Sequence, residues 1–542
     1  MLRKRTIALL ALLVFLVVFT TYFCTLSLAF EDDSPYYYVL IMRGPTLNEH
    51  HLLWFTIEKF LSDIVSAPGS SVNLVQMMKW TNAASGALAC VFVFLLLLSV
   101  TVDASFSFLT ALIVAFSQPL WNVCTHGKLY ALSGFLVVTF YCLFKANREG
   151  SRRPMWVAGL THALAVLANN LNGLLIFVIL AGIFFPGRRS CLKDRIVPAF
   201  HYLAAFVISL ILFVPLIMPS FHMTGISDTL KSVSSQVLAR TQLGRAFMYE
   251  SLRVFSDIDG VALRTESLLL FSVILFVAVI SLLYLLPGIR ARLPWRFEYA
   301  LCLLWLMVVS VSSFFAWSYN FTMSMIPLGI LCGLGFALMA KSTLDERAAL
   351  LRRRIVLSVF AAIVLATVYL NATGIFLPAS KGLTDPLYGP VAAYASLITP
   401  NDFVITSDFG ETLYFSYFLH CKVRNVSLND YADMQKPEAF LEDVTSALNE
   451  GQRVYLHKSP YFDSPHYILN GPSFTFQFAE NLEHANLDAK SLKSVRIYTS
   501  ADLRHRLAAL ADLVLVSKYS EHDSLLLLKL RSNPAASPGK KR

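Results

Sequence analysis

The sequence predicts a polytopic α-helical membrane protein with about 11 transmembrane helices, followed by an exported C-terminal α/β domain. Two observations carry this prediction. The 542 residues are 56% hydrophobic and 15% charged, whereas soluble proteins average about 45–50% apolar and about 25% charged residues. The apolar residues also form runs that are long enough to cross a bilayer. A cytosolic enzyme, a disordered regulator and a collagen-like fibre are therefore excluded.

The first apolar run, residues 7–30, follows the basic stretch Arg3-Lys4-Arg5. It is longer than the core of a cleaved signal peptide, so we expect an uncleaved signal-anchor helix. Ten further spans are expected within residues 1–372, which form the membrane module. They lie near residues 82–102, 105–120, 130–145, 155–169, 171–186, 197–219, 266–287, 298–317, 321–340 and 355–372.

The distribution of Lys and Arg predicts the orientation of these spans. With the N-terminus inside, the inside loops hold 19 Lys and Arg residues, and the outside segments of the membrane module hold nine over longer stretches. This pattern follows the positive-inside rule. It places the C-terminal domain and the two long loops, 31–80 and 220–265, on the outside. Compact loops favour a bacterial inner membrane, with a cytoplasmic N-terminus and a periplasmic C-terminal domain.

Charge and motifs exclude several functions. The net charge is +10, but from Asn371 onward 17 Lys and Arg face 18 Asp and Glu, so the excess lies between the hydrophobic runs and predicts no nucleic-acid partner. The inside loops are short and contain no G-x-x-x-x-G-K-[ST], which argues against an ATP-binding domain. Eight cysteines without a C-x-x-C motif disfavour a zinc site or a disulfide framework.

The periodicity changes after a Pro- and Gly-marked linker, residues 373–400. Residues 401–531 are expected to alternate strands with helices, as in a small α/β domain, and the tail 532–542 to be disordered. The expected strands are 402–407, 422–427, 453–458, 513–517 and 525–530, and the expected helices are 411–420, 437–449 and 502–511. Asp408 and Glu411 stand where the first strand meets its helix, as a ligand site or as a simple helix cap.

Three acids, Glu31, Asp32 and Asp33, follow the first span at its outer end. Clustered carboxylates repel one another, so the pKa of one should rise. Such a group can take a proton from a hydroxyl nucleophile or bind a metal ion. The alternative is a set of solvated acids in which Asp32 or Asp33 caps the next helix.

Two histidines, His50 and His51, precede an amphipathic run that suits a helix lying in the outer interface. Adjacent residues point in different directions on a helix, so the two rings cannot easily hold one metal. One of them can face a cavity and bind a phosphate or a sugar. The alternative is that both are ordinary interfacial polar residues.

This layout resembles the glycosyltransferase C superfamily. Its protein O-mannosyltransferases (glycosyltransferase family 39) carry Asp-Glu in the first outside loop and then His-Pro-Pro-Leu. This chain has Asp32-Asp33 and, after a similar interval, His50-His51-Leu52-Leu53, without the proline pair. The resemblance implies an integral-membrane glycosyltransferase that moves a sugar from a polyprenyl-phosphate donor to a protein, lipid or glycan acceptor on the outside.

The resemblance also implies roles for particular residues. Asp32 or Asp33 would deprotonate the acceptor hydroxyl for an inverting displacement, with Glu31 beside them; a divalent metal on Asp32 and Asp33 is left open. The departing phosphate needs cationic partners. Candidates for contacts to the phosphate or sugar are His50, His51, Arg43, His126, Lys128, Arg240 and Arg245.

Simpler interpretations of these groups remain. Lys128 and its aromatic neighbours suit a membrane interface, and Arg240 and Arg245 suit an amphipathic helix drawn to anionic lipids. Asn169, Asn170 and Asn172 form an expected outside turn that could bind sugar hydroxyls, although asparagine is also a common turn former. Two other functions stay open: a transporter or flippase, disfavoured because the span centres are almost free of charge, and a non-catalytic assembly factor for envelope glycans.

Overall fold

A computed structural model describes the protein over most of its predicted helices and strands. The described residues are 4–28, 52–65, 74–126, 132–149, 153–184, 193–217, 295–315, 321–341, 346–382, 388–406, 409–425, 437–458, 468–469, 497–498, 507, 509–520 and 524–530. The chain divides into two compact units. The first holds Met1–Ser27 and Tyr37–Lys381, and the second holds Leu28–Tyr36 and Gly382–Arg542.

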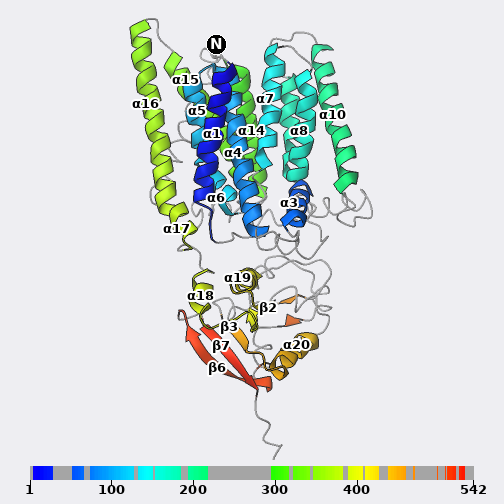
Figure 1. Ribbon diagram of the computed structural model, residues 1–542. Helices are drawn as coiled ribbons and strands as arrows, with labels where there is room; N and C mark the ends of the chain where they lie inside the picture. The colour runs from blue at the N-terminus through cyan, green and yellow to red at the C-terminus, as the bar shows by residue number, and fades with distance from the viewer. Residues whose placement is uncertain are drawn as a thin grey trace, which may run out of the picture. The chain divides into compact units, whose positions relative to one another are not determined.

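The first unit is a bundle of helices that run side by side (Figure 1). Its helices are α1 (Lys4–Cys24), α3 (Leu52–Val65), α4 (Leu74–Thr101), α5 (Ala104–Ala115), α6 (Gln118–His126), α7 (Gly134–Glu149), α8 (Arg153–Ala168), α9 (Leu175–Phe184), α10 (Lys193–Ile217), α14 (Arg296–Phe315), α15 (Phe321–Lys341) and α16 (Glu346–Asn371). A 3-10 turn, η2 (Asn170–Leu174), precedes α9, while a π-helix, η5 (Ala372–Phe376), and α17 (Leu377–Ser380) follow α16. Each predicted span coincides with one of these helices except two: 105–120 is divided between α5 and α6, and 266–287 lies outside the described residues.

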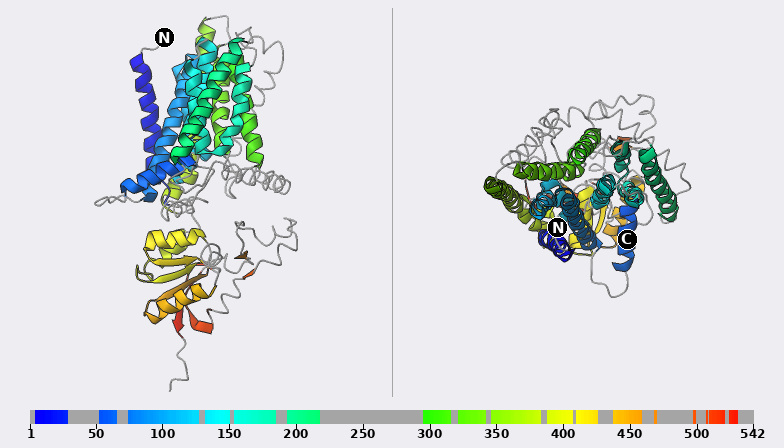
Figure 2. Two further views of the ribbon diagram at one scale, coloured as in Figure 1. Left: turned by 90° about the vertical axis from the view of Figure 1, so that its right-hand side faces the viewer. Right: turned by 90° about the horizontal axis from the view of Figure 1, so that it is seen from above.

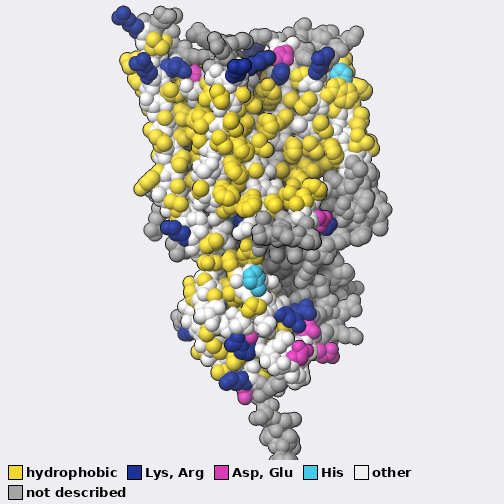
Figure 3. Space-filling model, in the orientation of Figure 1, with side chains coloured by type: hydrophobic (Ala, Val, Ile, Leu, Met, Phe, Trp, Pro, Cys, Tyr) yellow, Lys and Arg dark blue, Asp and Glu magenta, His cyan; other side chains and the backbone are white. Residues whose placement is uncertain are grey.

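Several of these helices are suited to a membrane. Among the described residues, four helices are long and apolar enough to cross a bilayer, or five if the bent pair α5–α6 is one span. Large apolar side chains such as Phe177, Ile211 and Leu365 are exposed on the bundle. Figure 3 shows a wide band of hydrophobic side chains, with Lys and Arg gathered at the end where α1 begins. We call this the basic end, and the opposite end the His126 end.

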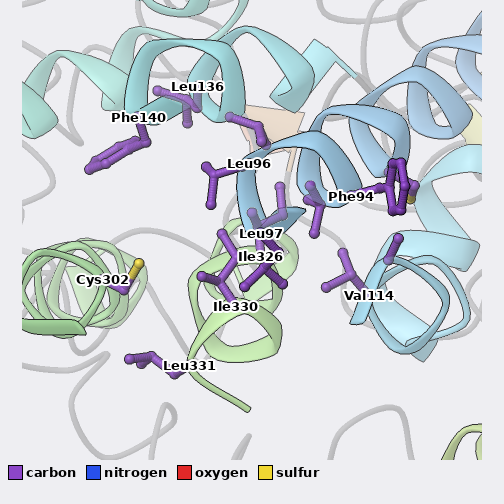
Figure 4. Packing of buried hydrophobic residues seen from close by; sticks show 14 of the residues in the cluster. Phe94, Leu96, Leu97, Val114, Leu136, Phe140, Cys302, Ile326, Ile330 and Leu331 are labelled. Atoms are coloured by element: carbon purple, nitrogen blue, oxygen red, sulfur yellow. The ribbon is translucent and has the colours of Figure 1, made fainter. Parts of the chain in front are cut away.

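The bundle core packs aromatic and aliphatic side chains from several helices, among them Phe94 of α4, Phe140 of α7 and Ile330 of α15 (Figure 4). Phe140 of α7 stacks on Trp305 of α14 with ring centroids 3.9 Å apart. On α15, Gly329 and Gly333 lie four residues apart against Val114 and Thr110 of α5, and a Cβ at either glycine would overlap those side chains. Small residues at this spacing allow two helices to approach closely.

Two ion pairs join helices at the basic end. Asp103 caps α5 by accepting from the Ser105 amide and pairs with Arg353 of α16 at 3.0 Å. Arg148 of α7 donates to Glu298 of α14 at 2.8 Å and also to two carbonyls at the end of α4. Both acids lie at ends of predicted spans, and each of them contacts an arginine there.

The predicted straight span 105–120 is instead a bent pair, α5 and α6, with an angle of 60° between them. The bend leaves two carbonyls without helical partners, and side chains that are distant in the sequence donate hydrogen bonds to them instead. The Tyr22 hydroxyl of α1 donates to the Ala115 carbonyl at 2.5 Å. The Asn371 amide at the end of α16 donates to the Phe116 carbonyl at 2.8 Å. Such substitutes are required because lipid cannot hydrogen-bond a freed carbonyl.

The second unit contains a five-stranded sheet in the order β2-β1-β3-β7-β6. The strands are β1 (Phe403–Thr406), β2 (Lys422–Asn425), β3 (Val454–Lys458), β6 (Ala511–Lys518) and β7 (Ser524–Leu530), and the short strands β4 (Ile468–Leu469) and β5 (Ile497–Tyr498) pair apart from it. β1 runs parallel to β2 and β3, whereas β7 is antiparallel to β3 and β6. These five strands agree with the expected ones to within a few residues.

Three helices accompany the sheet: α18 (Tyr388–Tyr394), α19 (Phe409–Leu419) and α20 (Pro437–Asn449). Figure 2 shows α19 and α20 on opposite sides of the strands. The side facing α20 buries Phe403, Ile405 and Val454. α20 ends at Asn449, and Gly451 follows it with a φ of +77°, a left-handed conformation that favours glycine.

Candidate functional site

The segment that leads into the acidic triad is held at the His126 end of the bundle. Beyond the last turn of α1, the Ser27 amide donates to the Thr125 carbonyl of α6 at 3.2 Å. The Lys79 ammonium of α4 donates to the Ser27 carbonyl at 2.6 Å. The Trp121 indole of α6 donates to the Thr25 hydroxyl at 2.8 Å. Helices α4 and α6 therefore fix the backbone a few residues before Glu31.

His126 is the last residue of α6. Its ring is buried, with Nδ1 3.1 Å from the Asn122 carbonyl oxygen and 3.2 Å from the Thr125 hydroxyl. Donation to a carbonyl oxygen requires Nδ1 to carry the proton, so Nε2 holds the lone pair of the neutral ring. Once the ring is protonated at Nε2 as well, that nitrogen becomes a cationic donor.

Lys79 is a buried cation that the sequence analysis did not single out. It lies one turn into α4, and only 5% of its surface is exposed. Its signal was a lysine among Val75, Met78 and Trp80 immediately before a predicted span, where a surface lysine would not be expected between large apolar residues. Through its hydrogen bond to the Ser27 carbonyl, the Lys79 side chain lies beside the entry to the first loop.

The amphipathic run after His51 folds as the helix α3, so the expected helix is confirmed. α3 packs against α4, α8 and α10. The Trp54 indole donates to Asn82 of α4 at 3.3 Å. The opposite face is exposed and carries Phe60 and a Lys59–Asp63 pair at 3.4 Å. α3 thus turns one face toward the bundle and one away from it.

Glu58 lies on the buried face of α3 and is fully enclosed. Neither carboxyl oxygen has a hydrogen-bond partner among the described residues. Loss of water around the charged form raises the pKa of Glu58 from 4.5 to about 8. The acid is therefore mainly neutral at pH 7 and can donate a hydrogen bond as well as accept one.

A second buried polar group lies where α8 meets η2. The His162 ring contacts the Tyr202 hydroxyl of α10 at 2.6 Å and the Asn172 carbonyl at 2.9 Å. The Asn172 side chain donates to the Ala165 carbonyl at 2.8 Å, and Asn169 is also buried. The Asn172 side chain therefore supports the turn itself.

Most of the predicted site residues lie outside the described residues. These are Glu31, Asp32, Asp33, Arg43, His50, His51, Lys128, Arg240 and Arg245. His126 is described, and the structure brings it together with Ser27 and Lys79 through Thr125. Within the described part of the chain, no group of three or more His, Cys, Asp or Glu side chains could hold a metal ion. A metal on Asp32 and Asp33 stays a prediction.

The second unit holds one buried pair near the first strand-to-helix junction. His457 of β3 lies 3.2 Å from Glu411 in the first turn of α19, and both side chains are almost fully enclosed. The Tyr394 and Phe415 rings pack around His457. Glu411 thus contacts the neighbouring strand, and Asp408 lies outside the described residues.

Comparison with known proteins gives a likeness in structure alone. No protein-family model matches the chain, and no curated protein sequence does. The chain is similar to the crystal structure of ArnT from Cupriavidus metallidurans bound to undecaprenyl phosphate, with 12% identity, a TM-score of 0.49 and coverage of 97% of this chain and 98% of that one. It is likewise similar to apo ArnT from the same organism, with 14% identity, a TM-score of 0.49 and coverage of 96% and 97%.

Proposed function

We propose that the protein is an integral-membrane glycosyltransferase that takes a sugar from a polyprenyl-phosphate donor and transfers it to an acceptor on the outer side of the membrane. The observation that carries the proposal is the fixation of Ser27 by Thr125 and Lys79. It ties the backbone that enters the acidic triad to a buried ammonium and to the residue next to His126. Acidic and cationic groups are what a sugar transfer from a phosphate requires.

The chemistry divides between the two kinds of group. Asp32 or Asp33 accepts the proton of the acceptor hydroxyl as that oxygen attacks the anomeric carbon. The bond from this carbon to the phosphate oxygen breaks on the opposite face, so the configuration inverts. Lys79 and His126 are the cationic partners proposed for the departing phosphate, with Arg43, Lys128, Arg240 and Arg245 as further candidates. Fixed positive groups stabilise such developing charge strongly when water is excluded.

Two features support transfer over transport. A lipid-linked donor supplies its own activated bond, which suits a chain whose predicted inside loops contain no G-x-x-x-x-G-K-[ST] motif. Ion-coupled transporters place ionisable groups in mid-membrane. Here the described acids Asp103 and Glu298 lie at helix ends and are paired with arginines.

The test is a transfer assay with the purified chain in nanodiscs. Polyprenyl phosphates that carry radiolabelled glucose, mannose, galactose or arabinose are incubated with envelope extract, and the label is followed into products. We expect transfer by the wild type and a loss of about 10²–10⁴-fold in Asp32→Asn or Asp33→Asn, the usual contribution of a general base.

The control is Asp63→Asn on the exposed face of α3, which should transfer at the wild-type rate. Wild-type transfer that survives in both single variants and in the double variant would refute the catalytic role of the two aspartates. No transfer from any of the four lipids, together with vectorial movement of label in sealed vesicles, would favour a transporter.

A further inference from the structure

Glu58 is a polar group that the fold does not satisfy. Buried carboxyls in native proteins nearly always have a hydrogen-bond partner, and an exception calls for an explanation. Both oxygens of Glu58 are enclosed, and neither has a partner among the described residues. A methionine or leucine would fill the same space without this cost. The carboxyl therefore has a use that the ligand-free packing does not account for.

The surroundings of Glu58 on α3 are aromatic. Trp54 lies one turn before it and Phe55 lies three residues before it, and both are buried. Their rings meet edge to face with centroids 5.2 Å apart. Ser62, one turn later, adds a hydroxyl to the same face. An apolar wall with a few polar groups is the usual lining of a small-molecule site.

The chemistry of this face selects among ligands. A divalent cation needs several oxygen ligands, and Glu58 shares its face with two aromatic rings and one hydroxyl. A phosphate accepts hydrogen bonds and favours cationic donors, whereas an acid that ionises would repel it. A sugar ring has neighbouring hydroxyls that both donate and accept, and its C–H faces suit an indole.

We propose that Glu58 is a sugar-binding residue, whose carboxyl hydrogen-bonds hydroxyls of the sugar carried on the lipid phosphate, with Trp54 against the ring. This inference rests on the proposed function and adds a specificity-determining residue to it. α3 also connects the two regions involved, because it follows His50 and His51 directly in sequence and packs on α4, the helix that carries Lys79.

Binding requires a movement of α3. The carboxyl is fully enclosed, so a sugar reaches Glu58 only when α3 moves relative to the helices on which it packs, α4, α8 and α10. The hydrogen bonds that the carboxyl forms with the sugar would offset the helix packing given up in that shift. Bare lipid phosphate, which has no sugar hydroxyls to offer, would gain nothing from it.

The experiment compares Glu58→Met, Glu58→Gln and the control Asp63→Asn in the full chain. Affinities are measured for bare polyprenyl phosphate and for polyprenyl phosphates bearing glucose, mannose, galactose or arabinose. We expect Glu58→Met to weaken binding of the sugar lipid that the wild type prefers by about tenfold or more. Binding of bare polyprenyl phosphate should stay within about twofold of the wild-type value, and Glu58→Gln should lose less.

Stability separates this role from a structural one. Glu58→Met should unfold at or above the wild-type temperature, because an unsatisfied buried acid has been replaced by an apolar side chain. Equal loss of bare and sugar-bearing lipids, or unchanged affinity for the sugar lipid, would overturn the inference. If the wild type transfers sugar and Glu58→Met does so with unchanged donor affinity, this inference alone falls. If the wild type neither prefers a sugar lipid nor transfers sugar, the proposed function falls with it.

Discussion

Replacing Glu58 by glutamine should change how the stability of the protein depends on pH. In the unfolded chain the Glu58 carboxyl ionises near its ordinary pKa of 4.5, whereas in the folded chain its pKa is about 8. Between these values the unfolded state loses the proton and the folded state keeps it. The folded state is therefore favoured least at high pH. The contribution of the Glu58 carboxyl to the unfolding free energy is fully present below pH 4.5 and is lost as the pH rises through 8.

The size of the effect follows from the same two values. Each pKa unit corresponds to about 1.4 kcal/mol, so the interval from 4.5 to 8 amounts to roughly 5 kcal/mol of unfolding free energy. Near neutral pH roughly 3 kcal/mol of that loss is already present, because most of the unfolded chains carry the charge. A glutamine at this position does not ionise and removes the pH-dependent part, although its amide is still buried without a partner.

The measurement is the thermal unfolding of wild type, Glu58→Gln and Asp63→Asn in detergent at several values between about pH 4.5 and pH 8.5, the window set by the two pKa values. We expect the wild type to lose stability as the pH rises, and the difference between Glu58→Gln and wild type to grow steadily in favour of the variant. Asp63→Asn, at an exposed position on the same helix, should follow the wild-type curve. Parallel curves for wild type and Glu58→Gln would refute the buried, neutral state of this acid.

Three further predictions concern other parts of the bundle. Lys79→Met should weaken binding of bare polyprenyl phosphate about tenfold, measured by titration in nanodiscs, because it removes a proposed phosphate partner; unchanged affinity would exclude that role. Gly333→Leu should lower the unfolding temperature by several degrees, since its side chain would overlap Thr110 and Leu97, whereas the control Gly173→Ala, which has only one distant neighbour, should not. Arg148→Met should destabilise the chain by roughly 2 kcal/mol, because Glu298 is left buried without its arginine. The double variant Arg148→Met/Glu298→Met should regain most of the lost unfolding free energy, as measured by chemical unfolding.

The helices of the bundle were predictable because each of them must present apolar residues over a length set by the bilayer. The strands β1 and β3 were predictable because short apolar runs lie between turn residues. The bend between α5 and α6 was not predictable, because the groups that support it, Tyr22 and Asn371, are far away in the sequence. Hydropathy sums over such a break and reports one straight span.

The candidate site was predictable only in part. His126 stood out because polar residues cluster between two apolar runs, yet its place at the end of a helix depends on the bend. Glu58 gave no strong local signal, since a single charge in an amphipathic segment is usually solvated, and Lys79 stood out only through its apolar neighbours Met78 and Trp80. The burial of Glu58 and Lys79 follows from packing between helices, which sequence spacing does not specify. The acids Asp32 and Asp33, the O-mannosyltransferase likeness and the outward orientation of the C-terminal domain stay predictions.

The two side chains that satisfy the α5–α6 bend come from opposite ends of the bundle's sequence. Tyr22 is made before α5, but Asn371 is the last residue of α16 and is synthesised 255 residues after the Phe116 carbonyl that it serves. Until α16 has been inserted, the Phe116 carbonyl therefore needs another hydrogen-bond donor, such as water, a lipid headgroup or a chaperone. A chain truncated before Asn371 should therefore stay in an unfinished state that membrane quality-control proteases recognise, even though every earlier helix has been inserted.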